Sequence, residues 1–162
     1  MTVRIRPAHT DELRRVGDIT AAAYTHDGHV GEDDDYVHHL RDAATREREA
    51  ELYVALVDDV LAGTVTFCPE GSRWREIGRE GEGEFRMLAV ASEHRQQGVA
   101  QALVGLCLER SRELGYDAVV LSSLESQAPA QRIYERLGFV RVPDRDWEPV
   151  PGLVLMGFRA VL

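Results

Sequence analysis

The stretch EFRMLAVASEHRQQGVAQALV, residues 84–104, places an arginine and two small residues between apolar segments. An apolar run ends at Val90, and Arg95, Gly98 and Ala100 precede a second run with helical spacing. A helix N-terminus presents unpaired backbone N–H groups and the positive end of its dipole, so it can hold a pyrophosphate. Small residues let phosphates approach, and an arginine adds a charge-assisted contact. The pattern predicts phosphate binding, although it is neither a P-loop nor the Gly-x-Gly-x-x-Gly dinucleotide motif.

A second motif, QAPAQRIYERLGF, occupies residues 127–139. Together the two motifs closely resemble the GNAT superfamily of acyl-CoA-dependent N-acetyltransferases, in which strand, Arg-x-x-Gly-x-Ala loop, helix, strand and Ala-x-x-x-Tyr-x-x-x-Gly-Phe follow in this order. The order of strands and helices along the whole chain is similar to that of the family. The N-terminal third resembles the family only in this order and carries no family motif. The resemblance implies a mixed α/β fold with a mostly antiparallel twisted sheet. The sheet is splayed between its fourth and fifth strands, and helices cover both faces.

The resemblance also implies how acetyl-CoA binds. The cofactor lies where the strand at 84–90 splays from the strand at 117–122, with its pantetheine on main-chain groups and its pyrophosphate on loop amides. Tyr134 matches the tyrosine that protonates the departing CoA thiolate, and Gln127 stands where many members carry Asn. The cofactor-binding residues expected on this basis are Leu88, Ala89, Val90, Arg95, Gln96, Gln97, Gly98, Val99, Ala100, Gln127, Ala130 and Tyr134.

Acyl transfer to an amine needs a base, because an amine with a pKa near 10.4 is only about one part in a thousand neutral at pH 7.4. Glu84 is the predicted catalytic base. It begins the motif strand, and its position resembles that of the base glutamate in family members that acetylate lysine side chains. By alternation, residues 84, 86, 88 and 90 share one face of that strand. Glu84 could act through a water molecule.

Each of these roles has a structural alternative. Residues 95–100 could form an ordinary turn into a helix. Tyr134 could be a core aromatic, since the residues around it are core residues by pattern. Glu84 could pair with Arg86 or Arg95, or face solvent.

The segment THDGHVGEDDD, residues 25–35, is polar and contains five acidic residues. Its histidines and acids lack the fixed spacing of metal ligands, so we expect no metal. An acidic lip on the acceptor groove is the favoured interpretation, and a solvated surface is the alternative. A lip of this kind would attract a cationic amine. The connection at 68–83 is also long enough to indicate a functional or mobile segment.

The elements that must position these residues follow from hydrophobic periodicity and turn residues. Strands and helices alternate as in a mixed sheet with helices on both faces. We expect strands at 3–6, 51–57, 60–67, 85–90, 118–121, 139–142 and 152–161, with Asp58-Asp59 as a hairpin turn. We expect helices at 10–24, 35–44, 98–114 and 126–137.

Length and composition limit the number of domains, the partners and the compartment that the chain can have. With 162 residues and 44% hydrophobic content, the chain is expected to be one folded domain, residues 1–162. A net charge of −9 argues against nucleic-acid binding, and no apolar run is long enough for a membrane helix or a secretory signal. All 19 basic residues are Arg. Cys68 and Cys107 are predicted to be buried thiols in a reducing cytoplasm.

The sequence therefore predicts an acetyl-CoA-dependent N-acetyltransferase that acts by direct attack of a primary amine on the thioester. Tyr134 is the expected acid and Glu84 the expected base. Two alternatives stay open: a non-catalytic acyl-CoA sensor, and a transferase for another acyl group. The expected acceptor is a small-molecule or peptide amine, and polyamines, antibiotic amines, amino acids, peptide N-termini and protein lysines all stay open. The resemblance also implies a possible homodimer through the C-terminal strands.

Overall fold

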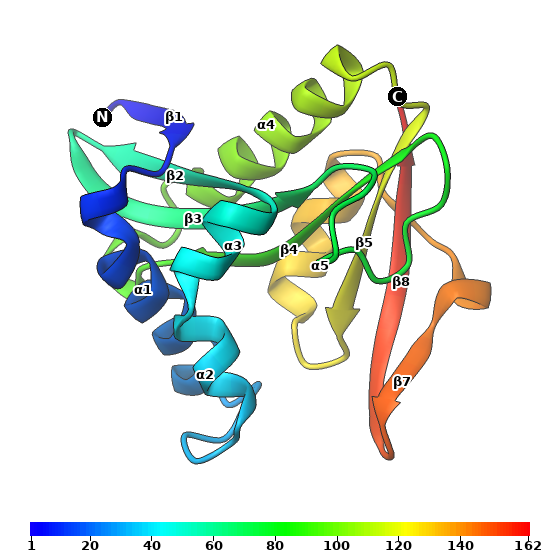
Figure 1. Cartoon of the computed structure of the whole chain (residues 1–162), viewed down its shortest axis with the longest axis horizontal. Coiled ribbons are helices and arrows are strands. Elements are labelled where there is room, and N and C mark those ends of the chain that lie inside the picture. Colours follow the sequence, from blue (N-terminus) through cyan, green and yellow to red (C-terminus); the bar gives the residue numbers. More distant parts are fainter.

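A computed structural model describes all of residues 1–162, and its centre is one twisted sheet of eight strands (Figure 1). The strand order is β1-β2-β3-β4-β5-β8-β6, with β7 paired to β8. All pairs are antiparallel except β4 and β5, which are parallel. The strands are β1 Val3–Pro7, β2 Glu51–Val57, β3 Val60–Cys68, β4 Glu82–Val90, β5 Ala118–Leu124, β6 Val140–Arg141, β7 Trp147–Val150 and β8 Leu153–Val161.

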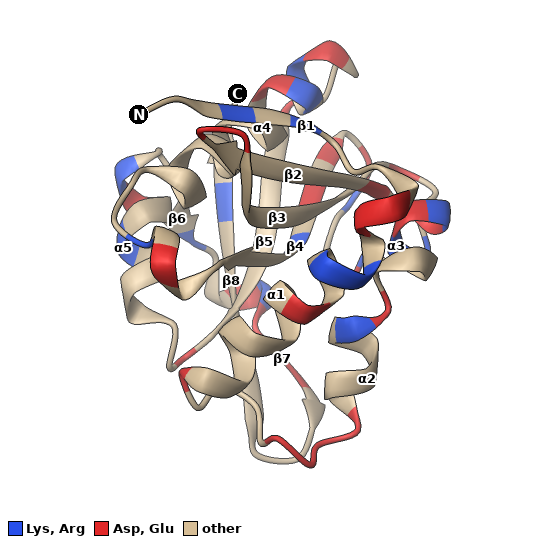
Figure 2. Cartoon of the chain, turned by 90° about the vertical axis from the view of Figure 1, so that its left-hand side faces the viewer, with Lys and Arg blue, Asp and Glu red and all other residues tan.

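Helices cover both faces of the sheet. The α-helices are α1 Leu13–His26, α2 Tyr36–Arg41, α3 Ala43–Glu49, α4 Val99–Glu113 and α5 Ala128–Arg136; short 3-10 turns are η1 Thr10–Glu12, η2 Ser92–His94 and η3 Pro143–Arg145. Residues of α4 and α5 pack with Phe67, Phe85 and Phe158 in the largest core cluster. Residues of α1, α2 and α3 form three smaller clusters on the other face (Figures 1 and 2). The predicted fold class is confirmed.

The parallel pair β4–β5 is short, and this determines where a ligand can enter. Only residues 82–84 of β4 pair with residues 118–120 of β5. Beyond Glu84 the two strands part, while β4 continues to pair with β3 as far as Val90. The edge of β4 that faces β5 therefore lacks a strand partner from Phe85 onward. The expected splay between the fourth and fifth strands is present.

A β-bulge in β4 changes which side chains share a face. Thr66 pairs with Arg86 and Thr64 with Ala89, so two residues of β4 lie opposite one residue of β3. The first of the two, Met87, takes a φ of 55°. Residues 88 and 90 pack against the α4 side of the sheet, whereas Met87 and Ala89 pack against the α1–α2 side. The prediction that residues 84, 86, 88 and 90 share one face is wrong, because the bulge interrupts the alternation.

Other differences are local. The helix predicted at 35–44 is two helices, because Asp42 leaves the helical conformation and its side chain caps α3 by accepting from the N–H of Thr45 at 3.1 Å. The strand expected at 139–142 is reduced to residues 140–141. Strand β7, which no sequence pattern predicted, forms an arm with β8. The Asp58-Asp59 turn is confirmed, with φ values of 48° and 69°.

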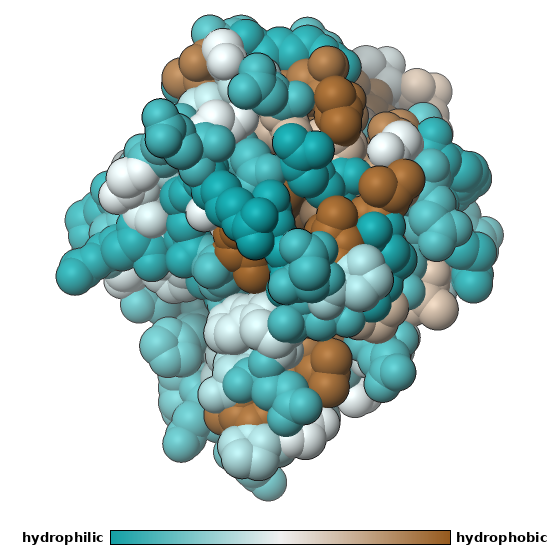
Figure 3. Space-filling view, turned by 90° about the vertical axis from the view of Figure 1, so that its right-hand side faces the viewer, coloured by the Kyte–Doolittle hydropathy of each residue, from teal (hydrophilic) through white to brown (hydrophobic).

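Among the exposed large apolar residues, Val150, Leu153 and Val154 lie together at the turn between β7 and β8. Figure 3 shows separate apolar areas among hydrophilic residues on the face that carries β8. Both cysteines are buried and free, as predicted. No helix has the length and apolar character needed to cross a membrane. The dimer expected from the resemblance stays a prediction.

Candidate active site

A cavity of about 270 Å³ lies where β4 and β5 have parted. Its walls come from β4 and β5 beyond their paired segment, from α1 and α2, from the loop before β4, and from the β7–β8 arm. The lining residues are Tyr24, His29, Val30, Asp34, Tyr36, Glu76, Arg86, Met87, Ser122, Leu124, Gln127, Pro149, Val150, Leu153 and Leu155. Such a volume is at the small end of ligand pockets.

The predicted phosphate loop has the backbone that anion binding requires. Gly98 precedes α4 with a φ of 78°, and Gln96 has a φ of 61°. No backbone N–H from Gln96 to Ala100 donates to another group of the chain. A Cβ added at Gly98 would meet no atom within 4 Å, so open space lies in front of the loop. Free N–H groups at a helix start, without side-chain obstruction, fit a pyrophosphate.

Arg95 has a partner that the sequence did not indicate. Its guanidinium lies 2.9 Å from the Asp27 carboxylate, which follows α1. Both side chains are partly exposed, so the pair is accessible to solvent and to a competing anion. Any phosphate that bound Arg95 would share it with Asp27 or displace Asp27.

Tyr134 lies in the core beside the point where the strands part. Its ring stacks edge-on against Phe85 at 5.9 Å and Phe139 at 5.9 Å. Phe85 is the first β4 residue beyond the paired segment. Burial raises the pKa of Tyr134, so the phenol carries its proton at neutral pH. Tyr134 does not line the cavity, so these contacts are those of the core alternative, and the acid role stays a prediction.

Gln127 and Ala130 lie at the start of α5. The side-chain oxygen of Gln127 accepts from the backbone N–H of Leu124 at 2.9 Å, and Gln127 also lines the cavity. Ala130 packs against the core cluster that holds Tyr134. Both predicted cofactor residues therefore lie on the α5 side of the splay.

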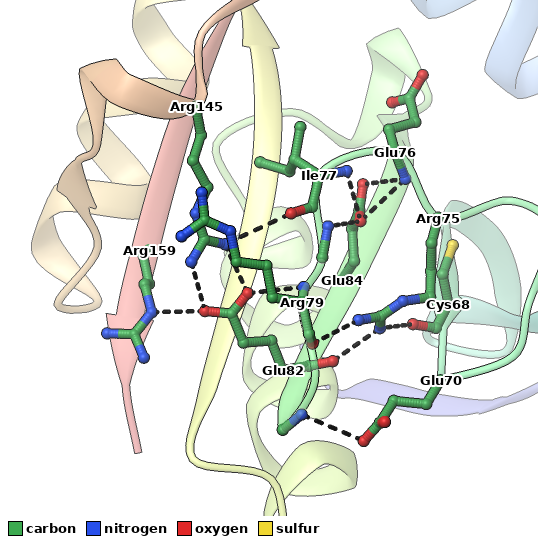
Figure 4. Close-up of polar contacts among 12 residues, drawn as sticks. Cys68, Glu70, Arg75, Glu76, Ile77, Arg79, Glu82, Glu84, Arg145 and Arg159 are labelled. Carbon is green, nitrogen blue, oxygen red and sulfur yellow. Dashed lines mark hydrogen bonds and ion pairs between the residues drawn. The ribbon is translucent and has the colours of Figure 1, made fainter.

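Glu84 has contacts that differ from those expected of a base. Its side chain is fully buried and does not line the cavity. Its carboxylate accepts backbone N–H groups from Glu76 at 3.1 Å, Ile77 at 3.2 Å and Gly78 at 2.8 Å (Figure 4). Burial raises its pKa, and these hydrogen bonds oppose that effect. A carboxylate that is buried and bonded in this way is poorly placed to contact an amine directly. Its hydrogen bonds fix the backbone of residues 76–78.

A second buried carboxylate fixes the same region. Glu82 accepts from Arg145 at 2.5 and 2.9 Å, from Arg159 at 2.7 Å, and from the N–H of Arg79 at 2.9 Å. Arg145 follows β6 and Arg159 lies on β8, so Glu82 reaches across β5 (Figure 4). Burial alone would raise the pKa of Glu82, but the arginines outweigh it and lower the pKa to about 2. We call Glu82, Arg145 and Arg159 together the Glu82 clamp.

Side-chain hydrogen bonds fix the backbone of the segment 68–83, which favours the functional interpretation of its length over the mobile one. Arg75 donates to the backbone carbonyls of Cys68 at 3.2 Å, Arg79 at 2.8 Å and Glu82 at 2.7 Å. Together with Glu84 and the Glu82 clamp, these hydrogen bonds tie the segment to β3, β4 and β8. A rigid segment can place a side chain accurately at the cavity.

Glu76 and Arg86 are the functional candidates that the sequence analysis missed. Glu76 Oε1 lies 3.1 Å from Arg86 Nε, and both residues line the cavity. Arg86 also donates to the Tyr36 hydroxyl at 3.2 Å and to the Trp74 carbonyl at 3.2 Å, with its guanidinium over the Trp74 ring. The length of the connection at 68–83 pointed to this region, but no spacing singled out Glu76.

The acidic segment 25–35 contributes less to the cavity than expected. Among its acids only Asp34 lines the cavity, and Asp27 is paired with Arg95. Figure 2 shows acidic residues, in red, along the loop that leads into α2. Most acidic residues of the segment 25–35 therefore lie on the solvated surface, which was the alternative to an acidic lip on the acceptor groove.

Comparisons with known proteins show the family and the fold. The sequence model of the Acetyltransferase (GNAT) family matches residues 13–139. Over 87 residues the chain is 37% identical to N-acetyltransferase 8B of Homo sapiens, which covers 54% of this chain and 37% of that protein. The chain spans less than half of the length of the first curated relatives that it matches.

Solved structures show the same fold at low sequence identity. An N-acetyltransferase from Thermoplasma acidophilum, in complex with coenzyme A, is 12% identical with a TM-score of 0.77 over 100% of both chains. A putative acetyltransferase from Salmonella typhimurium, with its cofactor acetyl-CoA, is 20% identical with a TM-score of 0.70 over 100% of this chain and 95% of that chain. Since the family match spans most of the chain, this protein belongs to the GNAT acetyltransferase family, and the resemblance read from the motifs is confirmed.

Proposed function

We propose that the chain transfers an acetyl group from acetyl-CoA to a primary amine by direct attack of the amine on the thioester. The observation that carries this proposal is the parting of β4 and β5 beside a helix start whose N–H groups at 96–100 are free. The N-acetyltransferases that the chain resembles in sequence, and the cofactors bound by the two structural neighbours, support the same activity. All eight strands join one sheet, which supports treating residues 1–162 as one unit.

The cofactor fits the chain's own groups. The free N–H groups from Gln96 to Ala100 hold the pyrophosphate, and Arg95 adds charge once it is released from Asp27. The unpaired edge of β4, at Leu88, Ala89 and Val90, supplies main-chain groups for the pantetheine. The bound thioester supplies the activated acetyl carbonyl.

Tyr134 is the proposed acid for the CoA thiolate. It is held protonated by burial, and it packs on Phe85 at the origin of the splay. Glu84 is then a positioning residue, because its carboxylate fixes the backbone of residues 76–78. The two buried free cysteines support a reducing compartment, and we propose the cytoplasm.

A matched pair of glycine variants tests the phosphate loop. Gly98→Ala places a methyl group where the phosphates approach, and Gly115→Ala makes the same change after the other end of α4. Both glycines have a positive φ, 78° and 77°, and neither added Cβ meets an atom within 4 Å. Both variants should therefore lose about 1 kcal/mol of stability through the same backbone strain.

Only Gly98→Ala should weaken acetyl-CoA binding, measured by calorimetric titration. We expect a loss of about 10-fold or more, because the methyl group displaces phosphates from the N–H groups. Equal cofactor affinity in wild type, Gly98→Ala and Gly115→Ala would remove the phosphate-loop assignment.

A further inference from the structure

The cavity has an apolar wall and a polar end. Its apolar side is formed by residues from the ends of β4 and β5, the segment after α1 and the β7–β8 arm: Val30, Met87, Leu124, Pro149, Val150, Leu153 and Leu155. At the polar end lie Glu76, Arg86 and Tyr36, joined by the contacts described above. An elongated ligand with one charged end and an apolar body matches this division.

Glu76 offers the free acceptor oxygen of the polar end. Its Oε1 lies 3.1 Å from Arg86 Nε, and no group of the chain donates a hydrogen bond to its Oε2. The side chain is 18% exposed, although the residue lies at the surface through its backbone. Figure 4 shows the Glu76 carboxylate pointing away from the carboxylates of Glu82 and Glu84. The backbone N–H of Glu76 donates to the Glu84 carboxylate, and this bond fixes the position of the Glu76 backbone from which its side chain extends.

The charges around Glu76 decide how much positive charge a ligand can bring. Arg86 and Glu84, both on β4, face it with opposite effects, and Asp34 and His29 line the same cavity from the segment after α1. The phenols of Tyr24 and Tyr36 stay neutral because burial raises their pKa values. Burial also raises the pKa of Glu76 against the pull of Arg86. Two carboxylates, Asp34 and Glu76, and one guanidinium, Arg86, line the cavity. One singly charged ligand would therefore balance the net negative charge, and a second positive charge on the ligand would have no carboxylate to balance it.

We propose that the acceptor is a small primary amine with an apolar body and a single positive charge, whose ammonium group binds and gives up its proton to Glu76. This inference rests on the proposed acetyltransferase function and names the substrate class of that site. The apolar body lies along the wall formed by the β7–β8 arm and β5.

Protons and bonds balance in this scheme. Glu76 takes one proton from the ammonium and passes it to solvent through the cavity mouth. The neutral nitrogen forms the N–C bond, the C–S bond breaks, and Tyr134 donates its proton to the thiolate. The second amine proton leaves as the amide forms, and restores Tyr134 through solvent. The net products are an amide, free coenzyme A and one proton.

Substrate choice is the first test. Initial rates of CoA thiol release are measured with 2-phenylethylamine and with 1,4-diaminobutane under the same conditions. We expect kcat/KM to favour phenylethylamine by about 10-fold or more, because the diamine must bury a second ammonium against an apolar wall. A preference for the diamine overturns the proposed acceptor class.

A charge placed on the wall should change this preference. Leu153 lines the cavity and is 39% exposed, so Leu153→Glu can fold with a carboxylate at the apolar side. The variant should raise kcat/KM for diaminobutane relative to phenylethylamine by about 10-fold. An unchanged ratio would show that the acceptor body does not lie along this wall.

The proton-accepting role is tested by pH profiles. Glu76→Gln should reduce kcat/KM for phenylethylamine by about 100-fold at pH 7. The loss should shrink as pH rises toward about 10, where the amine loses its own proton. Glu47→Gln removes the same charge from an exposed glutamate on α3 that makes no side-chain bond, and should match wild type. A uniform loss at every pH would remove the base role of Glu76.

Cofactor binding separates failure of this inference from failure of the proposed function. If acetyl-CoA binds and the diamine is acetylated in preference, the transferase stands and the acceptor inference is wrong. If acetyl-CoA binds but phenylethylamine is neither acetylated nor bound in calorimetry with coenzyme A, the acceptor inference is also wrong. If acetyl-CoA does not bind, the proposed function itself is wrong, and the inference falls with it.

Discussion

The substitution Glu82→Gln tests how the strands around the splay are held. Glu82 is 5% exposed at its side chain, and Arg145 is 9% exposed, so the substitution leaves a buried guanidinium without its carboxylate. Its pKa of about 2, against an ordinary value of 4.5, corresponds to about 3.4 kcal/mol of stability at neutral pH. Arg159 is 32% exposed, so screening by solvent reduces the expected effect to about 2 to 3 kcal/mol.

The sign of the pH dependence follows from the lowered pKa. The folded chain keeps Glu82 ionised to about pH 2, while the unfolded chain takes up the proton near pH 4.5. The stabilisation is therefore present above pH 4.5 and is lost as pH falls toward 2, with about 40% left at pH 3. The difference between wild type and Glu82→Gln should shrink by more than half between pH 7 and pH 3.

Thermal and denaturant unfolding measure both effects. At pH 7 the variant should melt about 4 to 12 °C below wild type, given the size of the chain. Glu47→Gln serves as the matched control and should melt with wild type. Our account of the Glu82 clamp would be refuted if Glu82→Gln melted with the control, or if its difference from wild type were the same at both pH values.

Two further substitutions test the site itself. Tyr134→Phe should lower turnover by about 10²- to 10⁴-fold and leave the calorimetric affinity for coenzyme A nearly unchanged, because only the acid is removed; unchanged turnover would end the acid assignment. Asp27→Asn should bind coenzyme A about 1.4- to 5-fold more tightly, because Arg95 is freed from a partly exposed ion pair at 2.9 Å; equal or weaker binding would show that Arg95 does not reach the phosphates.

The sequence predicted the elements whose signals are local. The strands from 51 to 68 and their turn at Asp58-Asp59 follow from alternation and turn chemistry, and the structure has them. The loop before α4 also follows from local pattern, since an arginine and a glycine precede a run of helical periodicity. Period and turn residues act within a few positions, which is why they could be read directly.

The errors concern features set by distant partners. Whether β4 carries a bulge at Met87 depends on its register with β3, and alternation along one strand contains no information on that register. Strand β7 exists because it pairs with β8. Its short segment, which includes Pro149, has no strand signal of its own.

The roles proposed for Glu84 and Glu76 likewise depend on contacts between distant residues. Both are glutamates within ten residues of each other, and the resemblance pointed to the one on the strand. Glu84 is occupied because the segment 76–78 folds back over β4 and donates three N–H groups to it. That return of the chain is a tertiary contact, so only the structure shows which carboxylate keeps a free oxygen at the cavity.

The decisive experiment for the proposed transferase activity follows release of free CoA thiol from acetyl-CoA across a panel of primary amines, with mass detection of the acetylated amine. We expect CoA release that depends on the amine and matches the amount of acetylated product, together with calorimetric binding of acetyl-CoA. Binding of acetyl-CoA with no amine-dependent release in the whole panel would contradict the transferase and favour a sensor of acyl-CoA.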